Sequence, residues 1–438
     1  MSRRTPLVGF LVADAISLLG TRVSMIAIPW LVLTTTGSAA QTGLVAFAEL
    51  LPLVVVQALA GPVIDRLGAR RVAITGDLLS MLVVGVIPVL HLSGTLSFPA
   101  LLALVAVGGG LRGAGDGAKH AFVPALSAHA QVPLERTTGL TSAVERTASF
   151  GGAALAGLLI AVVGPANALL VDAASFGICA AVFAWSTASL RAEPVAERPA
   201  DTTYARELRE GWDFLRRDPV LVAMTAMVAV TNLLDLAYSG VLLPVWVKDG
   251  GYGAGVLGAI FATWAASSAI GSVVAAWAAE RMPRFQVYLW AFLIAGLPRF
   301  LVLALGAPLW LVMATCVLGG FASGFLNPIL GAVIYERVPD AVMGRVTTLS
   351  NALCWSLMPF GGLLGGVLSE TIGISAALLV VGFAYFAATM APLAIPAFRQ
   401  FDRPQAELAN PATGGQVEEH RPEPSLRGTD DASRNPVS

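Results

Sequence analysis

Long apolar segments recur along the whole chain, and they limit what it can fold into more than any other feature. A segment of about 20 apolar residues crosses a bilayer as a helix, because lipid offers no hydrogen-bond partners to an exposed backbone. Only 13% of the residues are charged, whereas about 25% of a soluble domain is charged. We predict an all-α membrane protein with twelve transmembrane helices, at residues 7–33, 41–62, 72–92, 99–126, 138–163, 166–189, 219–246, 254–279, 286–305, 309–334, 345–368 and 373–396.

The distribution of arginine gives these segments an orientation. Loops after the odd-numbered segments hold one lysine or arginine, Lys248. Loops after the even-numbered segments hold Arg66, Arg70, Arg71, Arg136, Arg191, Arg198, Arg206, Arg209, Arg216, Arg217, Arg281, Arg284 and Arg337. Because cytoplasmic loops carry the basic excess in membrane proteins, we expect a multi-pass protein of the cell membrane with both termini in the cytoplasm. The preference for Ala, Gly and Arg over Lys is typical of a GC-rich bacterial source.

The loop between the second and third segments, Gly61–Arg71, has the spacing Gly-x-x-x-Asp-Arg-x-Gly-x-Arg-Arg. This spacing resembles the signature loop of the major facilitator superfamily (MFS) of transporters, which joins helices 2 and 3. The resemblance covers roughly residues 7–398. It implies a fold of two pseudo-symmetric six-helix bundles.

In that family the loop works as a latch. Its acid lies against the N-terminus of helix 11, where free N–H groups and the helix dipole favour an anion, and holds the inner side shut. By position Asp65 is this acid, and Arg345 near the start of helix 11 is expected to pair with it. A loop that only fixes topology is the alternative. The other motif residues are the basic companions Arg66, Arg70 and Arg71, and Gly61 and Gly68, which permit close packing and the turn.

Short sequences repeat in the two halves of the chain. Thr137-Thr138 followed by Phe150-Gly151-Gly152 matches Thr347-Thr348 followed by Phe360-Gly361-Gly362. Repeated halves are the basis of alternating access in transporters. The predicted domains are an N-terminal six-helix bundle at 1–190, a cytoplasmic linker with an amphipathic helix at 191–218, a C-terminal six-helix bundle at 219–398 and a disordered cytoplasmic tail at 399–438.

Ionisable residues lie inside several predicted helices, where they are costly and therefore candidates for function. Arg112 resembles the mid-membrane arginine of the family's fourth helix, although Gly115-Asp116 replaces the usual polar-Gly pair. Arg112 and Asp116 are four residues apart and can pair on one helix face. Arg22 and Glu49 lie at similar depth, by the rise of 1.5 Å per residue, so a pair between their helices is expected.

Helices 1, 4, 7 and 10 line the cavity in this family, which directs attention to their polar residues. The candidates for the cavity and for proton coupling are Asp14, Arg22, Glu49, Arg112, Asp116, Asp235 and Asn327. Burial favours a neutral carboxyl group and a nearby arginine favours the ionised one. We therefore predict that Glu49, Asp116 or Asp14 takes up a proton from outside as substrate leaves. Lys119 either carries function or extends to the membrane surface, and His120 is expected to be a packing residue.

Glycines recur in the fifth predicted helix. In drug exporters of the superfamily a Gly-Pro-x-x-x-Gly run lies here and marks antiporters; this chain has Ala153 where the proline is expected. Close helix packing, common in any membrane bundle, is the alternative role. The glycines expected at helix contacts are Gly151, Gly152, Gly157, Gly361 and Gly362.

Several stretches resemble the twelve-helix exporters of drugs, macrolides and siderophores, among them Ala27-Ile28-Pro29-Trp30 and Phe122-Val123-Pro124-Ala125-Leu126. The resemblance implies proton-coupled efflux of an amphipathic small molecule, such as a drug, a macrolide-like antibiotic or a secondary metabolite. A siderophore exporter is the nearest alternative. A proton-coupled importer of a polar nutrient and a scaffold without transport are the others.

Other function classes lack support in the sequence. There is no Gly-x-x-x-x-Gly-Lys-Ser/Thr nucleotide-binding motif and no catalytic triad, so neither an enzyme nor a cofactor is expected, and the proton gradient is the expected energy source. The three cysteines lie singly in apolar segments, which indicates no metal site. The expected partners are the lipid bilayer, a small amphipathic substrate and protons, without nucleic acid, and the expected functional unit is a monomer.

Overall fold

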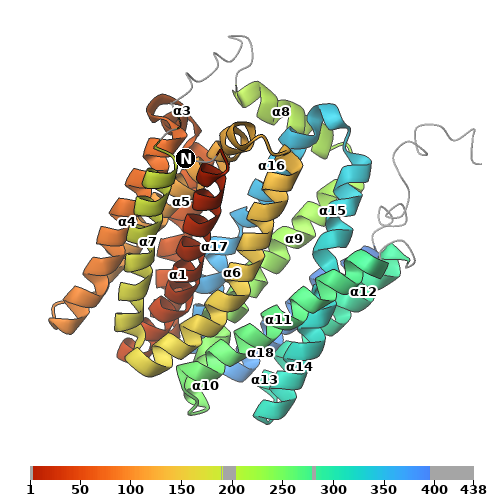
Figure 1. Cartoon of the computed structure of the whole chain (residues 1–438). Helices are drawn as coiled ribbons and strands as arrows, with labels where there is room; N and C mark the ends of the chain where they lie inside the picture. Colours follow the sequence, from red (N-terminus) through yellow and green to blue (C-terminus); the bar gives the residue numbers. More distant parts are fainter. Residues whose placement is uncertain (1–2, 189, 191–203, 279–282, 395–438) are drawn as a thin grey trace, which may run out of the picture. The chain divides into compact units, whose positions relative to one another are not determined.

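The computed structural model of the chain describes residues 3–188, 190, 204–278 and 283–394, and every regular element within these ranges is a helix (Figure 1). The predicted all-helical fold is thereby confirmed for the described residues. The predicted tail at 399–438 and the start of the linker at 191–203 lie outside them.

Helices of the N-terminal half continue through their internal prolines. They are α1 (Thr5–Thr36), α2 (Ala39–Leu59), α3 (Gly61–Leu67), α4 (Ala69–Leu92), α5 (Phe98–Ala130), α6 (Leu134–Val163) and α7 (Pro165–Ser186). Pro29, Pro52, Pro88 and Pro124 each lie inside one of them, as neighbouring helices in a membrane permit. α1 packs against α6 and α7, and α5 packs against α2 and α4.

In the C-terminal half, by contrast, four membrane segments are broken. The elements are α8 (Tyr204–Leu215), α9 (Pro219–Ala237), the π-helical turn η1 (Tyr238–Leu242), α10 (Leu243–Asp249), α11 (Ala254–Ala278), α12 (Arg284–Ala295), α13 (Leu297–Ala304), α14 (Leu309–Ser323), α15 (Leu326–Arg337), α16 (Asp340–Ser356), α17 (Met358–Ile372), α18 (Ile374–Met390) and the 3₁₀ turn η3 (Ala391–Leu393). Each break precedes a helix with proline in its first turn: Pro244, Pro298, Pro328 and Pro359. Proline fits there because it lacks the N–H that an interior position would need.

Eleven segments within the described residues are long and apolar enough to span a membrane, when broken segments such as Pro219–Asp249 are taken as one. The predicted segment outside this set is α6. Within α6, the stretch Gly151–Val163 is a shorter apolar helix segment. α6 nevertheless packs against both α1 and α11, and a twelfth crossing remains a prediction.

The two halves meet through glycines. We call the end of the bundle with Arg66, Arg70 and Arg71 the basic end, and the other end the opposite end. Toward the opposite end α6 meets α11 and α2 meets α17. A Cβ atom on Gly157 would come within 2.5 Å of the Gly258 Cα, and one on Gly362 would lie 2.9 Å from the Gly43 carbonyl oxygen. Helix backbones approach this closely only where side chains are absent.

Candidate functional site

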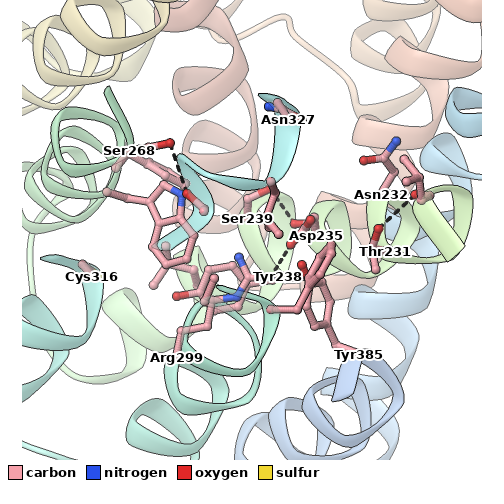
Figure 2. Close-up of a pocket in the computed structure, with 18 of the residues that line it drawn as sticks. Thr231, Asn232, Asp235, Tyr238, Ser239, Ser268, Arg299, Cys316, Asn327 and Tyr385 are labelled. Atoms are coloured by element: carbon pink, nitrogen blue, oxygen red, sulfur yellow. Dashed lines mark hydrogen bonds and ion pairs between the residues drawn. The ribbon is translucent and has the colours of Figure 1, made fainter. Parts of the chain in front are cut away.

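A cavity of about 470 Å³ lies within the C-terminal half (Figure 2). Its walls come largely from the broken segments: Asp235, Tyr238 and Ser239 lie in or beside η1, Arg299 on α13 and Asn327 on α15. Irregular backbone at membrane depth is tolerated where it lines a cavity, and π-turns within helices are frequent at functional sites. The volume is in the range of small-molecule sites, roughly 300–1,000 Å³.

Asp235 and Arg299 form an ion pair in the cavity wall (Figure 2). Four aromatic rings surround the guanidinium group, with centres 4.8–5.1 Å from its Cζ: Tyr238, Trp264, Phe300 and Tyr385. Rings at this distance attract a cation through their quadrupoles. Only 9% of the Arg299 side chain is accessible, whereas 41% of the Asp235 side chain is. The pair therefore buries its cation and presents its carboxylate to the cavity.

Most of the remaining lining is apolar or aromatic. Asn232 donates its side-chain N–H to the Cys354 carbonyl oxygen at 2.9 Å, which occupies part of its hydrogen-bonding capacity. Asn327 is exposed on the wall. Among the described lining residues, Asp235 and Arg299 are the two that carry charge. The cavity thus suits a mainly apolar molecule with few polar or charged groups.

The other predicted cavity residues lie in the N-terminal half, at Asp14, Arg22, Glu49, Arg112 and Asp116. Glu49 on α2 pairs with Arg112 on α5, and both side chains are buried. The sequence predicted Arg22 as the partner of Glu49. Depth along a helix does not fix the direction in which a side chain points. Arg22 lies beside Gly152 of α6, where a Cβ atom would come 2.6 Å from the Arg22 Cβ.

Lys119 on α5 is buried and does not extend to the membrane surface. Its ammonium group donates to Asp77 on α4 at 2.9 Å and to Ser17 on α1 at 3.4 Å. Asp116 lies 3.8 Å from the same group, so it faces Lys119 and not Arg112, the partner that the four-residue spacing predicted. A second cluster of buried charge therefore lies between Arg112 and the basic end.

The environments of Asp14 and His120 also differ from each other. Asp14 on α1 is half-buried. His120 was predicted to be a packing residue, but it is exposed, with Nε2 3.6 Å from a Glu145 carboxylate oxygen on α6. The prediction failed because an apolar sequence around a residue does not show which helix face is covered.

The signature loop contains a short helix, α3, where the sequence predicted a tight turn. Gly68 ends α3 with φ of 85°, a conformation that glycine adopts without strain. A Cβ atom on Gly61 would have no neighbour within 4 Å, so close packing does not require that glycine here. Arg70 donates to Thr187 Oγ1 and to the Ala184 carbonyl oxygen, both at 2.8 Å, and ties α4 to the end of α7. Arg66 and Arg71 are exposed.

The predicted contact between Asp65 and Arg345 is not made in this conformation. Asp65 is exposed on α3, and Arg345 pairs with Glu210 on the linker helix α8. α16 begins at Asp340, earlier than predicted, so Arg345 lies more than a turn inside the helix. Gly211 lets α8 lie close to it: a Cβ atom there would be 3.1 Å from the Arg345 carbonyl oxygen.

Four of the five predicted packing glycines lie at close helix contacts. They are Gly152, Gly157, Gly361 and Gly362. A Cβ atom on Gly361 would come 3.0 Å from the backbone nitrogen of Ala237, the last residue of α9 before η1. Gly151 differs, because it is exposed and its Cβ would make only an ordinary contact of 3.5 Å with Leu19.

Comparison with known proteins assigns the chain to a family. The model of the transmembrane secretion effector family, a branch of the MFS, matches residues 6–422. The chain belongs to this family. It is thus a membrane transporter and not an enzyme, as predicted. The transporter is 30% identical to the multidrug efflux pump Tap of Mycobacterium tuberculosis (strain ATCC 25618 / H37Rv) over 95% of this chain and 99% of that one. It is 29% identical to Tap of Mycolicibacterium fortuitum, over 92% and 98% of the two chains.

Solved structures show the same fold. The nucleoside transporter NupG aligns with a TM-score of 0.67 and 15% sequence identity, over 91% of this transporter and 100% of NupG. A bacterial homologue of the iron transporter ferroportin, in an inward-facing state, aligns with a TM-score of 0.64 and 14% identity, over 88% and 98%. At these identities the likeness establishes architecture alone.

The sequence analysis missed residues of the cavity and of the charged cluster around Lys119. Asp77 was not singled out, although a carboxylate in an apolar segment is a signal that could have found it. The aromatic residues Tyr238, Trp264 and Tyr385 were not selected as candidates for the cavity. Aromatic residues are ordinary in membrane helices, and only the position of Arg299 among them indicates a special role.

Proposed function

We propose that this transporter exports amphipathic small molecules, including drug-like compounds, from the cytoplasm. The observation that carries the proposal is the cavity of about 470 Å³, with aromatic walls and one exposed carboxylate. Such a lining favours a lipophilic molecule over a sugar, which would need many hydrogen bonds. Similarity over nearly the full length to efflux pumps of the Tap type supports the same substrate class.

Transport in this proposal proceeds by alternating access between two six-helix bundles, 1–190 and 219–398. The basic end faces the cytoplasm of a bacterial cell, in keeping with its loop arginines. The glycine contacts of α2 with α17 and of α6 with α11 close the opposite end. The structure then corresponds to a state in which substrate enters from the cytoplasm, and the transporter works as a monomer.

Asp65 acts as the latch acid in the other state. When the basic end closes, α3 approaches α16, and Arg345 exchanges Glu210 for Asp65. The exposure of Asp65 and the pairing of Arg345 with Glu210 in the present conformation are compatible with an open latch. Arg70 anchors the loop to α7, while Arg66 and Arg71 remain available to the cytoplasmic surface.

Proton coupling belongs to the N-terminal half in this scheme. Glu49, Asp14 and Asp116 are the candidate proton carriers, and Arg112 and Lys119 are the cations beside them. Coupling through a proton gradient needs no cofactor. If Glu49→Gln, Asp116→Asn and Asp14→Asn each leave proton-driven transport unchanged, the assignment of the carriers is wrong.

The decisive experiment measures energised efflux of lipophilic dyes and antibiotics from cells with and without the transporter. We expect efflux that stops when the proton gradient is collapsed. Ser268→Trp, which fills the cavity, should abolish it, whereas Ser93→Trp in an exposed loop should not. Accumulation in place of efflux would indicate an importer, and no difference between the cells would overturn the proposal.

A further inference from the structure

The ion pair of Asp235 and Arg299 is asymmetric toward the cavity. Its carboxylate side chain is 41% accessible and its guanidinium side chain only 9%. Oδ1 of Asp235 accepts from Arg299, and no hydrogen bond to Oδ2 is present within the described residues. Asp235 lines the cavity, so this oxygen keeps its acceptor capacity beside the space where a ligand would lie (Figure 2).

Arg299 is held away from that space by its surroundings. Its Cζ lies 4.8–5.1 Å from the centres of four rings, and its Nε is buried without a hydrogen-bond partner in the described part of the chain. The guanidinium cannot swing into the cavity without losing the rings and Asp235 together. An anionic ligand would therefore have to displace Asp235 to reach a positive charge.

A cationic ligand meets no such obstacle. It can bind Oδ2 directly and rest its apolar part against the cavity walls, where Phe261 and Phe292 add further aromatic surface. At long range the charge of Arg299 cancels that of Asp235. The preference of the cavity for a cation over an anion therefore acts only on a ligand that contacts the carboxylate. The pair behaves as a fixed dipole with its negative end in the cavity.

We propose that Asp235 selects cationic amphipathic molecules, and that Arg299 is a positioning residue that fixes its carboxylate. The inference rests on the proposed function, since it takes the cavity as the substrate site. It goes further in naming the charge of the substrate and the two residues that determine it.

Binding of two ions with the same shape and opposite charge tests this selection. Tetraphenylphosphonium and tetraphenylborate are added to the purified full-length protein in detergent, with empty micelles as the blank. We expect tighter saturable binding of the cation to the unmodified protein. Asp235→Asn should weaken cation binding about 10- to 100-fold, because the charge–charge attraction between the bound cation and the carboxylate is lost, and should strengthen borate binding because Arg299 is no longer neutralised.

Three further variants make the outcome unambiguous. Asp235→Glu keeps the charge and should keep the preference for the cation. Asp213→Asn on α8, a carboxylate outside the cavity, should change neither affinity. If Asp235→Asn does not fold because Arg299 is left buried and unpaired, the double variant Asp235→Asn with Arg299→Gln removes both charges and should bind both ions equally.

Each result decides between the inference and the proposed function. Equal affinity of the unmodified protein for the two ions, no saturable binding of either, or an equal loss of both in Asp235→Asn would overturn the inference. Selective cation binding without energised efflux would instead overturn the export proposal and leave the charge selection standing. Efflux of neutral compounds that survives Asp235→Asn, while cation efflux is lost, supports both.

Discussion

Arg112 on α5 donates a hydrogen bond to Glu49 on α2, and both side chains are buried. Glu49→Gln would leave the arginine opposite a neutral amide, and loss of one partner of a buried pair costs about 3–5 kcal/mol. We expect this variant to lower the thermal unfolding midpoint of the purified protein. Glu49→Gln combined with Arg112→Gln should recover most of the loss, because no buried charge then lacks a partner.

An exposed pair provides the matched control. Glu336 and Arg284 lie 2.7 Å apart, with side-chain accessibilities of 37% and 36%. An exposed pair contributes about 1 kcal/mol or less, so Glu336→Gln should shift the unfolding midpoint far less than Glu49→Gln. Equal shifts would show that burial does not govern the energetics of these pairs.

Two glycines on the same helix should respond to alanine with opposite signs. A Cβ atom on Gly157 would come within 2.5 Å of the Gly258 Cα, whereas a Cβ atom on Gly139 has no neighbour within 4 Å. Gly157→Ala should cost about 1–3 kcal/mol through overpacking, and Gly139→Ala should gain up to about 1 kcal/mol of helix propensity. Thermal unfolding of both variants measures the difference, and a gain for Gly157→Ala would disprove the close contact.

The side chain of Asp218 caps a helix and also pairs with an arginine, and substitutions can separate these two contributions to stability. Its Oδ1 accepts from the backbone N–H groups of Val220 and Leu221 at the start of α9, and its Oδ2 lies 3.0 Å from Arg337. Asp218→Asn keeps the helix cap but loses the charge, and Asp218→Ala loses both. We expect the alanine variant to be less stable than the asparagine variant by about 0.5–2 kcal/mol, the contribution of a cap. Equal midpoints would mean that the cap contributes nothing.

The proposed exchange of partners by Arg345 predicts opposite shifts for two neutralised carboxylates. Spin labels at the exposed positions Val63 and Thr348 report the distance between α3 and α16. Asp65→Asn should lengthen the mean distance, and Glu210→Gln should shorten it. A coupling of about 1–3 kcal/mol corresponds to roughly 5- to 150-fold in the ratio of the two states. Shifts of the same sign would rule out the exchange, and Asp213→Asn should produce none.

The architecture could be predicted because lipid leaves the backbone few options. Every predicted apolar segment overlaps a helix. The breaks near Pro298 and Pro359 were not predicted. Proline continues inside α1 and α2, so its presence alone does not distinguish a broken helix from an intact one.

Partners of buried charges could not be predicted to the same degree. Sequence gives the depth of Glu49 through the helical rise, but rotation about the helix axis decides whether Arg22 or Arg112 meets it. The cavity shows the same limit. Asp235 and Asn327 stood out as polar residues in apolar segments, whereas Tyr238 and Trp264 gained meaning only from their packing around Arg299.

Asp235, Arg299 and the rings around them all belong to one half of the molecule. A substrate bound to these residues would move together with the C-terminal half through the whole transport cycle. Its contact with Asp235 would stay intact while the two bundles move relative to each other. Release of the substrate then depends on the loss of its contacts with the N-terminal half. A compound that binds both halves equally tightly should prevent the two bundles from separating and act as an inhibitor.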